Sequence, residues 1–417
     1  LSVAIPTRSF WLILLALVLL VPLFFLRKRT ATAVALAGCA GVAAGVWQGL
    51  VPQDFVFRGV DGVGTGVKWV IDYAHRGAEP VFGPILGLQG FIFAIEVGAI
   101  ILLFGGLMAI LYHVGVIPWV VGWMARLLHR ALGVSGAESL AAASNIFAGQ
   151  TEAPLIIRPY LPRMTRSEIM ALMTVGFATI AGSVLGAYIL MLTKAGLERG
   201  ASDLIAASVM SAPAAFVFAK MVVPETELAE TRDSAQLTHE PIGTKLLDSL
   251  AGGVTAALKL AVNVVAMLLV FYALIFMLND VVEWFARTVF GRENVTFQGL
   301  YAWLFRPFAA LIGVEWSDTL AVGELLGTKT IFNEFLAYDR LGEMVKEGQI
   351  GTRSAVLSTY ALCGFANFMS IGIQIAGLSQ LAPGKRPVFS SLALRAMVAG
   401  ALACQLTACI VGLIGKF

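Results

Sequence analysis

Apolar runs of about 20 residues, each long enough to cross a lipid bilayer as a helix, recur along the whole chain. Of its 417 residues, 58% are hydrophobic and only 13% are charged, whereas soluble domains carry about 25% charged residues. Strand-like alternation of the outer-membrane kind is absent. The sequence therefore predicts an all-α polytopic membrane protein. Eight transmembrane helices are expected, at residues 11–26, 32–50, 91–117, 168–193, 203–223, 252–280, 354–381 and 391–415.

Two further apolar stretches are interrupted by polar residues. The first, "NIFAGQTEAPLIIRP", places Gln150, Thr151 and Glu152 between a glycine and a proline, and the second, "TIFNEFLAY", has Asn333 and Glu334 in the equivalent place. Non-helical backbone is tolerated within a membrane only where it is buried in protein or lines a wet cavity. We therefore expect two re-entrant hairpins with tips near the middle of the membrane. They are predicted at residues 138–164 and 317–341.

The hairpins belong to an internal repeat. "TRSEIMALMTVGFATIAGS" from residue 165 matches "TRSAVLSTYALCGFANFMS" from residue 352, and each follows its hairpin closely. An odd number of crossings separates the two repeats, so the second enters from the opposite side of the membrane. Such inverted-topology repeats are typical of secondary transporters. The predicted units are N-terminal scaffold spans and interfacial helices at 1–90, a first repeat at 91–223, a polar linker at 224–251 and a second, inverted repeat at 252–417.

Glu152 is the most costly residue in the first hairpin. A carboxylate at the bilayer centre costs about 2.5–3.5 kcal/mol, so a functional role is the favoured hypothesis. The alternative is a structural pair with Arg158 or a protonated, packed carboxyl. The broken spans add Thr179, Asn367 and Ser370. Carboxylates, amides and hydroxyls without a cluster of basic residues suit a neutral, hydroxyl-rich solute better than a phosphate or a dicarboxylate.

Other classes of function find little support in the sequence. No basic patch has interleaved aromatic residues, which argues against nucleic acid as a partner. The four histidines lack ligand spacing, so no transition-metal site is expected. We find no Ser-His-Asp arrangement and no phosphate loop, and we expect neither an enzyme nor an organic cofactor.

The motifs "GQTEAPLIIRPYLPRMT" and "GFATIAGSVLGAY", followed later by "NEFLAY" and "CGFANFMSI", together resemble the concentrative nucleoside transporter family. The resemblance extends from about residue 90 to residue 417. It implies a sodium-coupled nucleoside importer of the bacterial inner membrane, built as a homotrimer whose transport parts move like elevators against a scaffold. Proton coupling is an alternative, because Glu152 or Glu334 could carry the proton, and a channel is a weaker one.

The resemblance also implies roles for individual residues. Those expected at the nucleobase are Gln150, Thr151, Glu152 and Val184. Those expected at the ribose are Leu260, Glu334, Phe365, Asn367 and Ser370. Those expected to hold sodium, the coupling ion, are the side chains of Asn145 and Thr179 and the carbonyls of Ala148 and Ile180. The family pattern gives no role to Glu96, so the role of this residue stays an open question.

Overall fold

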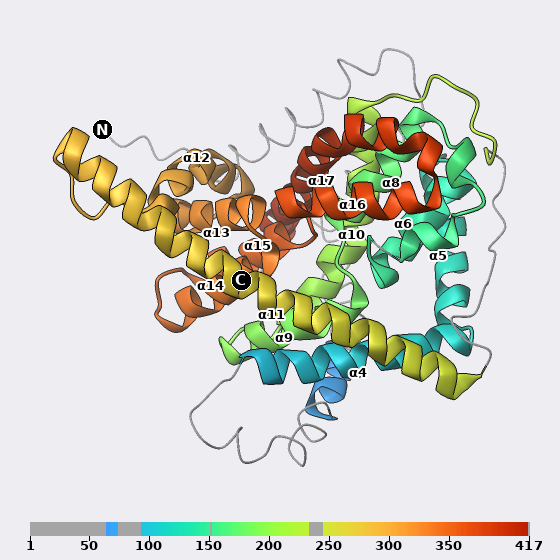
Figure 1. Ribbon diagram of the computed structural model, residues 1–417, viewed down its shortest axis with the longest axis horizontal. Helices are drawn as coiled ribbons and strands as arrows, with labels where there is room; N and C mark the ends of the chain where they lie inside the picture. Colours follow the sequence, from blue (N-terminus) through green and yellow to red (C-terminus); the bar gives the residue numbers. More distant parts are fainter. Residues whose placement is uncertain (1–63, 74–92, 151, 233–244, 416–417) are drawn as a thin grey trace.

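The computed structural model describes residues 64–73, 93–150, 152–232 and 245–415 (Figure 1). Every regular element in these ranges is helical, which confirms the predicted all-α class for this part of the chain. Five of its helical segments are long and apolar enough to cross a membrane: Ile95–His113, Arg166–Lys194, Gly200–Val222, Leu246–Phe290 and Pro383–Ile414. The spans predicted at 11–26 and 32–50 lie outside the described residues.

The helices follow one another in two similar series. The first series consists of α4 (Phe93–His113), α5 (Val116–Leu132), α6 (Gly136–Ala148), α7 (Ala153–Ile156), α8 (Arg166–Ala178), α9 (Gly182–Lys194) and α10 (Gly200–Val222), with a 3-10 turn at Leu161–Arg163. The second consists of α11 (Leu246–Phe290), α12 (Phe297–Ile312), α13 (Thr319–Ile331), α14 (Glu334–Lys346), α15 (Thr352–Leu362), α16 (Phe368–Leu381) and α17 (Arg386–Ile414), with 3-10 turns at Trp316–Asp318 and Pro383–Lys385.

The two series also pack in corresponding ways. Helix α6 contacts α8 as α13 contacts α15, and α10 contacts α8 as α17 contacts α15. Contacts between the series match too, because α8 packs on α17 while α15 packs on α10, and α9 packs on α14 while α16 packs on α7. The repeat found in the sequence is therefore present in the packing. The inverted orientation of the two repeats in a membrane stays a prediction.

The two hairpins differ in their second arms. After the first tip, α7 is only 4 residues long and is followed by turns. Pro154 fits in the first turn of α7, but Pro159 lacks the N–H that a continuing helix would need at that position. The second hairpin has no proline after its tip, and α14 runs for 13 residues to Lys346, beyond the predicted end at residue 341. Proline content thus decides how far each second arm stays helical.

Capping residues connect the start of the first hairpin to α8. Ser135 caps α6 and Thr165 caps α8, each in a capping box with a glutamate three residues later, Glu138 and Glu168. The Ser135 hydroxyl also donates to Glu168 Oε1 at 2.5 Å, and the partly buried Lys220 of α10 forms an ion pair with the buried Glu138. These polar contacts hold α6, α8 and α10 together at one end of the hairpin.

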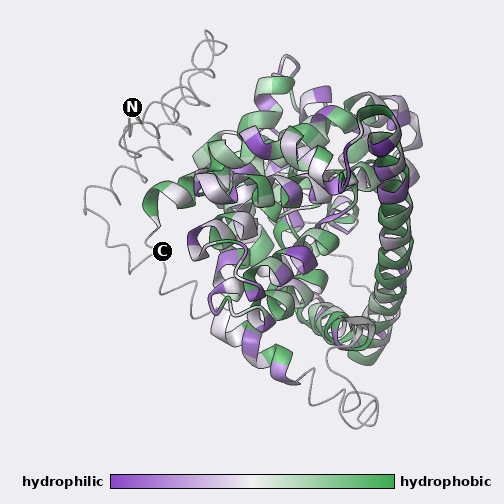
Figure 2. Ribbon diagram, turned by 90° about the vertical axis from the view of Figure 1, so that its left-hand side faces the viewer, coloured by the Kyte–Doolittle hydropathy of each residue, from purple (hydrophilic) through white to green (hydrophobic). Residues whose placement is uncertain are grey.

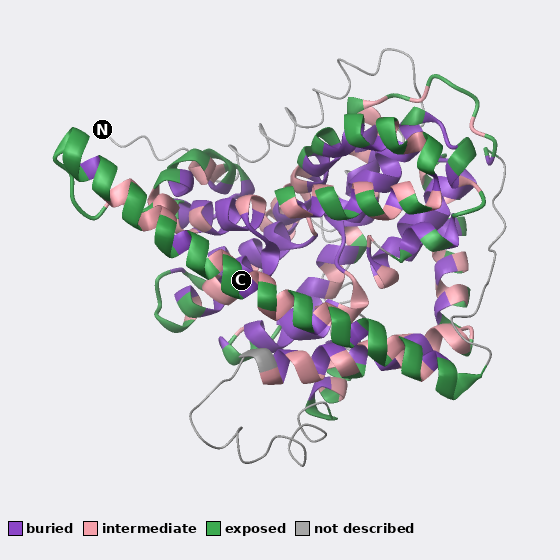
Figure 3. Cartoon of the chain, in the orientation of Figure 1, coloured by how far each residue is buried: buried purple, intermediate pink, exposed green. Residues whose placement is uncertain are grey.

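Helix α11 is 45 residues long, against the 252–280 span expected, and it begins inside the predicted polar linker. At 1.5 Å per residue it measures about 67 Å, more than twice the hydrocarbon core of a bilayer. It crosses the molecule in Figure 1 and exposes much of its surface in Figure 3. Leu269 and Phe276 on it are mostly exposed, and Figure 2 shows hydrophobic residues along most of its length. An apolar surface of this size is suited to lipid or to another subunit.

Small residues allow α4 and α11 to approach closely. A Cβ atom added at Gly105 would lie 2.4 Å from the Cβ of Ala257, and one added at Gly253 would lie 2.4 Å from the Cβ of Ala109. Each helix thus offers a glycine and an alanine four residues apart, the spacing that brings membrane helices into backbone contact. Near the start of α4, the buried Glu96 forms an ion pair with Lys194 of α9, which gives Glu96 a structural partner.

Gly105→Ala should lower the stability of the helical scaffold by about 1–3 kcal/mol, because the added methyl group forces α4 and α11 apart. Thermal unfolding of the purified protein in detergent would measure this. Gly98→Ala is the matched control, since a Cβ at Gly98 meets nothing within 4 Å. Equal melting temperatures for the two variants would contradict the close contact.

Candidate functional site

The first hairpin bends at Gly149, which directly follows α6. Its φ of 81° lies in the region that favours glycine. A Cβ there would also lie 2.4 Å from the Cβ of Ala181, so the bend contacts the break between α8 and α9 at residues 179–181. Glycine at this position therefore both turns the chain and brings the hairpin tip against a broken span.

The two broken spans also contact each other. Gly364, in the break between α15 and α16, has a φ of 84°, and a Cβ there would lie 2.5 Å from the Phe177 carbonyl oxygen and 2.7 Å from that of Ala178. The carboxyl end of α8 therefore lies against the break that follows α15. Four interrupted helical segments, two hairpin tips and two breaks, gather in one region of the molecule.

Asparagine side chains cap the two helices that begin at the tip and break of the second repeat. Asn333 Oδ1 accepts from the backbone N–H of Leu336 at 2.9 Å at the start of α14. Asn367 Oδ1 accepts from the backbone N–H of Ser370 at 2.8 Å at the start of α16. Each cap satisfies a backbone donor that would otherwise lack a partner.

Glu334, at the second tip, accepts two hydrogen bonds although it is only 4% exposed. The Tyr188 hydroxyl donates to its Oε1 at 2.8 Å, and Asn367 Nδ2 donates to its Oε2 at 2.9 Å. Tyr188 itself stacks on Tyr338 at a centroid distance of 4.7 Å. Donors from α9 and from the start of α16 thus fix the carboxylate in place.

The first tip reaches the same start of α16. Gln150 Nε2 donates to Ser370 Oγ at 3.4 Å, and Gln374 Nε2 donates to Gln150 Oε1 at 3.0 Å. Since Asn367 contacts Glu334 and Ser370 contacts Gln150, the first turn of α16 links the two hairpin tips. The structure therefore brings together four of the residues singled out from the sequence, from both repeats.

A second group of oxygen atoms lies around the end of α6 and the break of α8. Asn145 donates from Nδ2 to the Ala141 carbonyl at 2.9 Å, and its Oδ1 is buried without a partner among the described residues. Thr179 Oγ1 donates to the Val175 carbonyl at 2.9 Å and keeps its lone pairs. Uncharged oxygen atoms of this kind are hard ligands that suit an alkali cation better than a transition metal.

Comparison with known proteins gives this arrangement a family. The family model described as "Na+ dependent nucleoside transporter C-terminus" matches residues 203–412, and the model described as "Nucleoside recognition" matches residues 94–195. A Bacillus subtilis protein named "Uncharacterized transporter YutK" is 41% identical over 349 residues, which cover 83% of this chain and 84% of that protein. The chain belongs to the concentrative nucleoside transporter family.

Longer relatives and solved structures agree with this family assignment. Mouse "Solute carrier family 28 member 3" is 39% identical over 372 residues, which are 86% of this chain and 52% of that protein, so the chain spans about half the length of this curated relative. The structure of CNTnw in an inward-facing substrate-bound state superposes with a TM-score of 0.85 and 36% identity, covering 98% of both chains. A substituted CNTnw in an outward-facing state gives 0.85 and 35%, again covering 98% of both chains.

The remaining residues expected from the family resemblance fall into different environments. Val184 and Ile180 are buried, whereas Leu260 and Phe365 are partly buried against the same apolar cluster. Ala148, the last residue of α6, is partly buried. Thr151 lies outside the described residues.

Glu152 is exposed at the first tip. None of the ion pairs among the described residues joins it to Arg158, so the structural pair considered from the sequence does not form. Its carboxylate is instead left accessible at the end of the hairpin.

The sequence reasoning missed three residues at the site: Tyr188, Lys329 and Gln374. Lys329 is only 2% exposed, and its ammonium group donates to the carbonyl oxygens of Ala361 at 3.0 Å and Cys363 at 2.6 Å. It thus satisfies backbone acceptors at the carboxyl end of α15, where a positive charge is also favoured by the helix dipole. A charged residue inside an apolar hairpin, five positions before Glu334, was the available signal.

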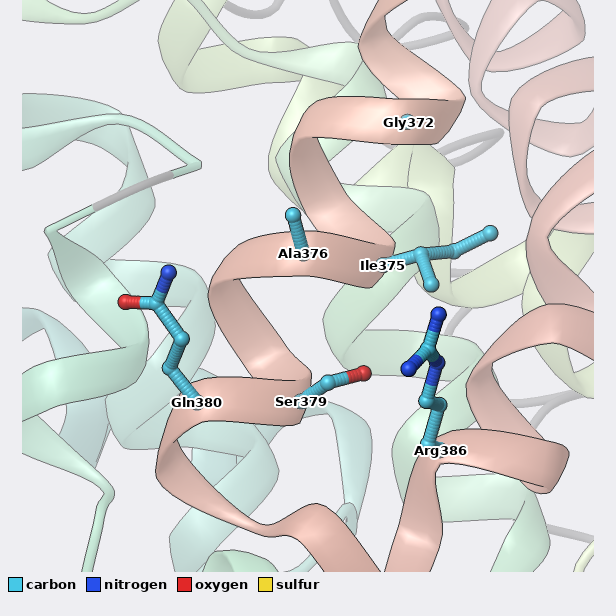
Figure 4. A pocket seen from close by; sticks show the side chains of 6 residues that line it. All are labelled: Gly372, Ile375, Ala376, Ser379, Gln380 and Arg386. Carbon is cyan, nitrogen blue, oxygen red and sulfur yellow. The ribbon is translucent and has the colours of Figure 1, made fainter.

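A separate hollow of about 540 Å³ lies on α16 and the start of α17. Figure 4 shows Ile375, Ser379 and Arg386 around it. Its α16 residues lie on the helix face opposite to Ser370 and Gln374, since successive residues are 100° apart around a helix. This hollow is therefore distinct from the region where the two tips meet.

Lys329→Met should destabilise the protein by several kcal/mol, because two carbonyl groups at a buried helix end lose a charged donor that contributes about 1.5–3 kcal/mol per bond. The melting temperature in detergent reports the change. Lys346→Met, at the exposed end of the neighbouring α14, is the control. A Lys329→Met protein as stable as this control would show that the carbonyl contacts are unimportant.

Proposed function

We propose that the protein imports nucleosides across the bacterial inner membrane and couples this to sodium entry. The observation that carries the proposal is the hydrogen-bonded connection from Gln150 through Ser370 and Asn367 to Glu334, which joins both hairpin tips at the start of α16. This connection occurs in a chain of the nucleoside transporter family. A rat relative of the chain is named "Sodium/nucleoside cotransporter 1".

In this proposal the second tip recognises the sugar. Glu334 Oε1 and Oε2 can accept hydrogen bonds from neighbouring ribose hydroxyls, and hydrogen bonds to a charged group are stronger than those between neutral groups. The amide of Asn367 and the hydroxyl of Ser370 complete the polar wall. Leu260 and Phe365 cover the apolar faces of the sugar.

The first tip recognises the nucleobase. Gln150 has both donor and acceptor atoms, which matches the edge of a base. Thr151 and the exposed Glu152 follow it in the sequence, and Val184 provides an apolar contact for the ring. Such a site discriminates by hydrogen bonds, because a buried polar group left unpaired costs free energy.

Sodium occupies the end of α6 in this proposal. Its ligands are the free Oδ1 of Asn145, the hydroxyl of Thr179 and the carbonyls of Ala148 and Ile180. Gln150 lies two residues beyond Ala148, so an ion that fixes this bend also orders the nucleobase subsite. Binding of either species then raises the affinity for the other, by the same factor in both directions.

Transport requires the site to face each side of the membrane in turn. We propose that the hairpins and broken spans move together as an elevator, against a scaffold containing the closely packed α4 and α11, within a homotrimer. The hairpins are re-entrant in this arrangement. Support comes from relatives solved in both inward-facing and outward-facing states and from the exposed apolar surface of α11.

Proton coupling is the second candidate mechanism, since Glu152 is accessible at the tip and Glu334 lies at the other. Oxygen atoms with free lone pairs near Asn145 favour sodium over this alternative. A channel is less well supported, because polar groups of both tips are linked across the site.

Purified protein in proteoliposomes should accumulate radiolabelled uridine when an inward sodium gradient is imposed, because the ion orders the base subsite. Accumulation should be lost when choline replaces sodium. Equal accumulation in both media would contradict sodium coupling, and uptake driven by a pH gradient in sodium-free buffer would select the proton mechanism.

Glu334→Gln should weaken uridine binding about tenfold to a hundredfold, because one acceptor oxygen becomes an amide donor that cannot pair with a hydroxyl proton. Isothermal titration of the detergent-purified variant measures the affinity. Glu343→Gln, on the exposed side of the same helix, should bind uridine as the parent does. Unchanged affinity in Glu334→Gln removes this carboxylate from the sugar site.

A further inference from the structure

Gln374 is a buried amide that the proposed function leaves without a role. It lies one helical turn after Ser370 on α16 and is 3% exposed. Its Nε2 donates to the Met173 carbonyl of α8 at 3.1 Å and to Gln150 Oε1 at 3.0 Å. It therefore connects the backbone of one broken span to the nucleobase end of the site.

The Met173 carbonyl fixes the orientation of the Gln374 amide. A backbone carbonyl can only accept, so the atom of Gln374 that faces it must be the nitrogen. The two protons of that nitrogen then point to the Met173 oxygen and to Gln150. If the amide were turned over, the Gln374 oxygen would lie about 3 Å from the Met173 carbonyl oxygen, and the two would repel. Hydrogen-bond partners of this kind decide the orientation of a side-chain amide.

Gln150 is oriented in turn. Because Gln374 presents an N–H to it, the atom of Gln150 on that side must be the acceptor, Oε1. Its Nε2 is left facing Ser370 at 3.4 Å, a long contact that exchanges readily for a better acceptor. A fixed backbone oxygen thus determines, through two amides, that Gln150 offers N–H donors to the site.

Gly176 leaves the space that this pair of amides needs. A Cβ at this position would lie 2.7 Å from Gln374 Nε2 and 3.2 Å from Gln150 Cβ. A side chain at position 176 would therefore displace one or both amides. The packing of α8 is therefore matched to the amide pair.

We infer that Gln374 is a positioning residue that makes Gln150 a donor toward the base, so that the transporter selects nucleosides with an oxo group at C4 of a pyrimidine or C6 of a purine over those with an amino group at the same position. The inference rests on the proposed function. The C4 oxo group of uridine or the C6 oxo group of inosine accepts from Gln150 Nε2, whereas the amino group that cytidine or adenosine carries at that position places one hydrogen-bond donor against another. Two buried donors that face each other both lack an acceptor, and this lowers the affinity for the amino nucleoside about tenfold.

Competition binding tests this, with cytidine against uridine and adenosine against inosine, on the sodium-loaded protein in detergent. The parent should prefer the oxo nucleoside in both pairs by about tenfold. In Gln374→Leu the Gln150 amide is free to turn over. The ratio of uridine to cytidine affinity and the ratio of inosine to adenosine affinity should then both fall toward one, while the variant still binds uridine. Gln380→Leu, on the exposed side of the same helix, should keep the parental ratios.

Two results would overturn the inference. One is a parent protein that binds oxo and amino nucleosides equally well. The other is a Gln374→Leu variant that keeps the preference of the parent. If the leucine variant does not fold, Gln374→Met, which is unbranched and close in volume, carries the same comparison. A parent protein that binds no nucleoside at all would instead refute the proposed function, so the two failures are distinguishable.

Discussion

The structure depends on satisfying the backbone groups of helices that end inside an apolar protein. Each unpaired N–H or C=O in such surroundings costs several kcal/mol. Asn333 and Asn367 cap the amino ends of α14 and α16, and Lys329 satisfies the carboxyl end of α15. In the first repeat Thr179 bonds back to the preceding turn, and Asn145 keeps a buried oxygen free. The second repeat is thus completed by its own side chains, whereas the first keeps an unpaired oxygen, which is the basis of the proposed sodium site.

In the proposed function this asymmetry assigns different tasks to the two repeats. The second tip is held by Tyr188 and Asn367 around Glu334, which yields a fixed carboxylate suited to a sugar. At the first tip, Gln150 is held by hydrogen bonds to Gln374 and Ser370. Whether this tip offers a donor or an acceptor therefore depends on the orientation of the Gln150 amide. Helix α16 contributes to both subsites from one short segment. In the proposed function, a few neighbouring residues therefore join substrate recognition to ion binding.

Much of this arrangement could be predicted from the sequence. The polar residues Gln150, Glu334, Asn367 and Ser370 stood out because polar groups in apolar spans are costly and therefore informative. Lys329 carried the same signal and was missed, since a single lysine does not form the basic cluster that anion binding suggests. Gln374 gave little warning, because an amide in a span is less costly than a charge and its partners are distant in sequence. Glu96 could be given a partner only when Lys194 was found beside it.

The sequence by itself determined the helical membrane class, the repeat and the location of both tips, because these follow from local hydrophobicity, proline and glycine. Proline content also explains afterwards why α7 ends after one turn while α14 continues. Only the tertiary structure decided which groups meet: that Ser370 and Asn367 face opposite tips, that Gly105 and Gly253 bring α4 against α11, and that the Met173 carbonyl orients two amides. Such pairings depend on the relative positions of helices from both halves of the chain, and no local pattern of residues encodes them.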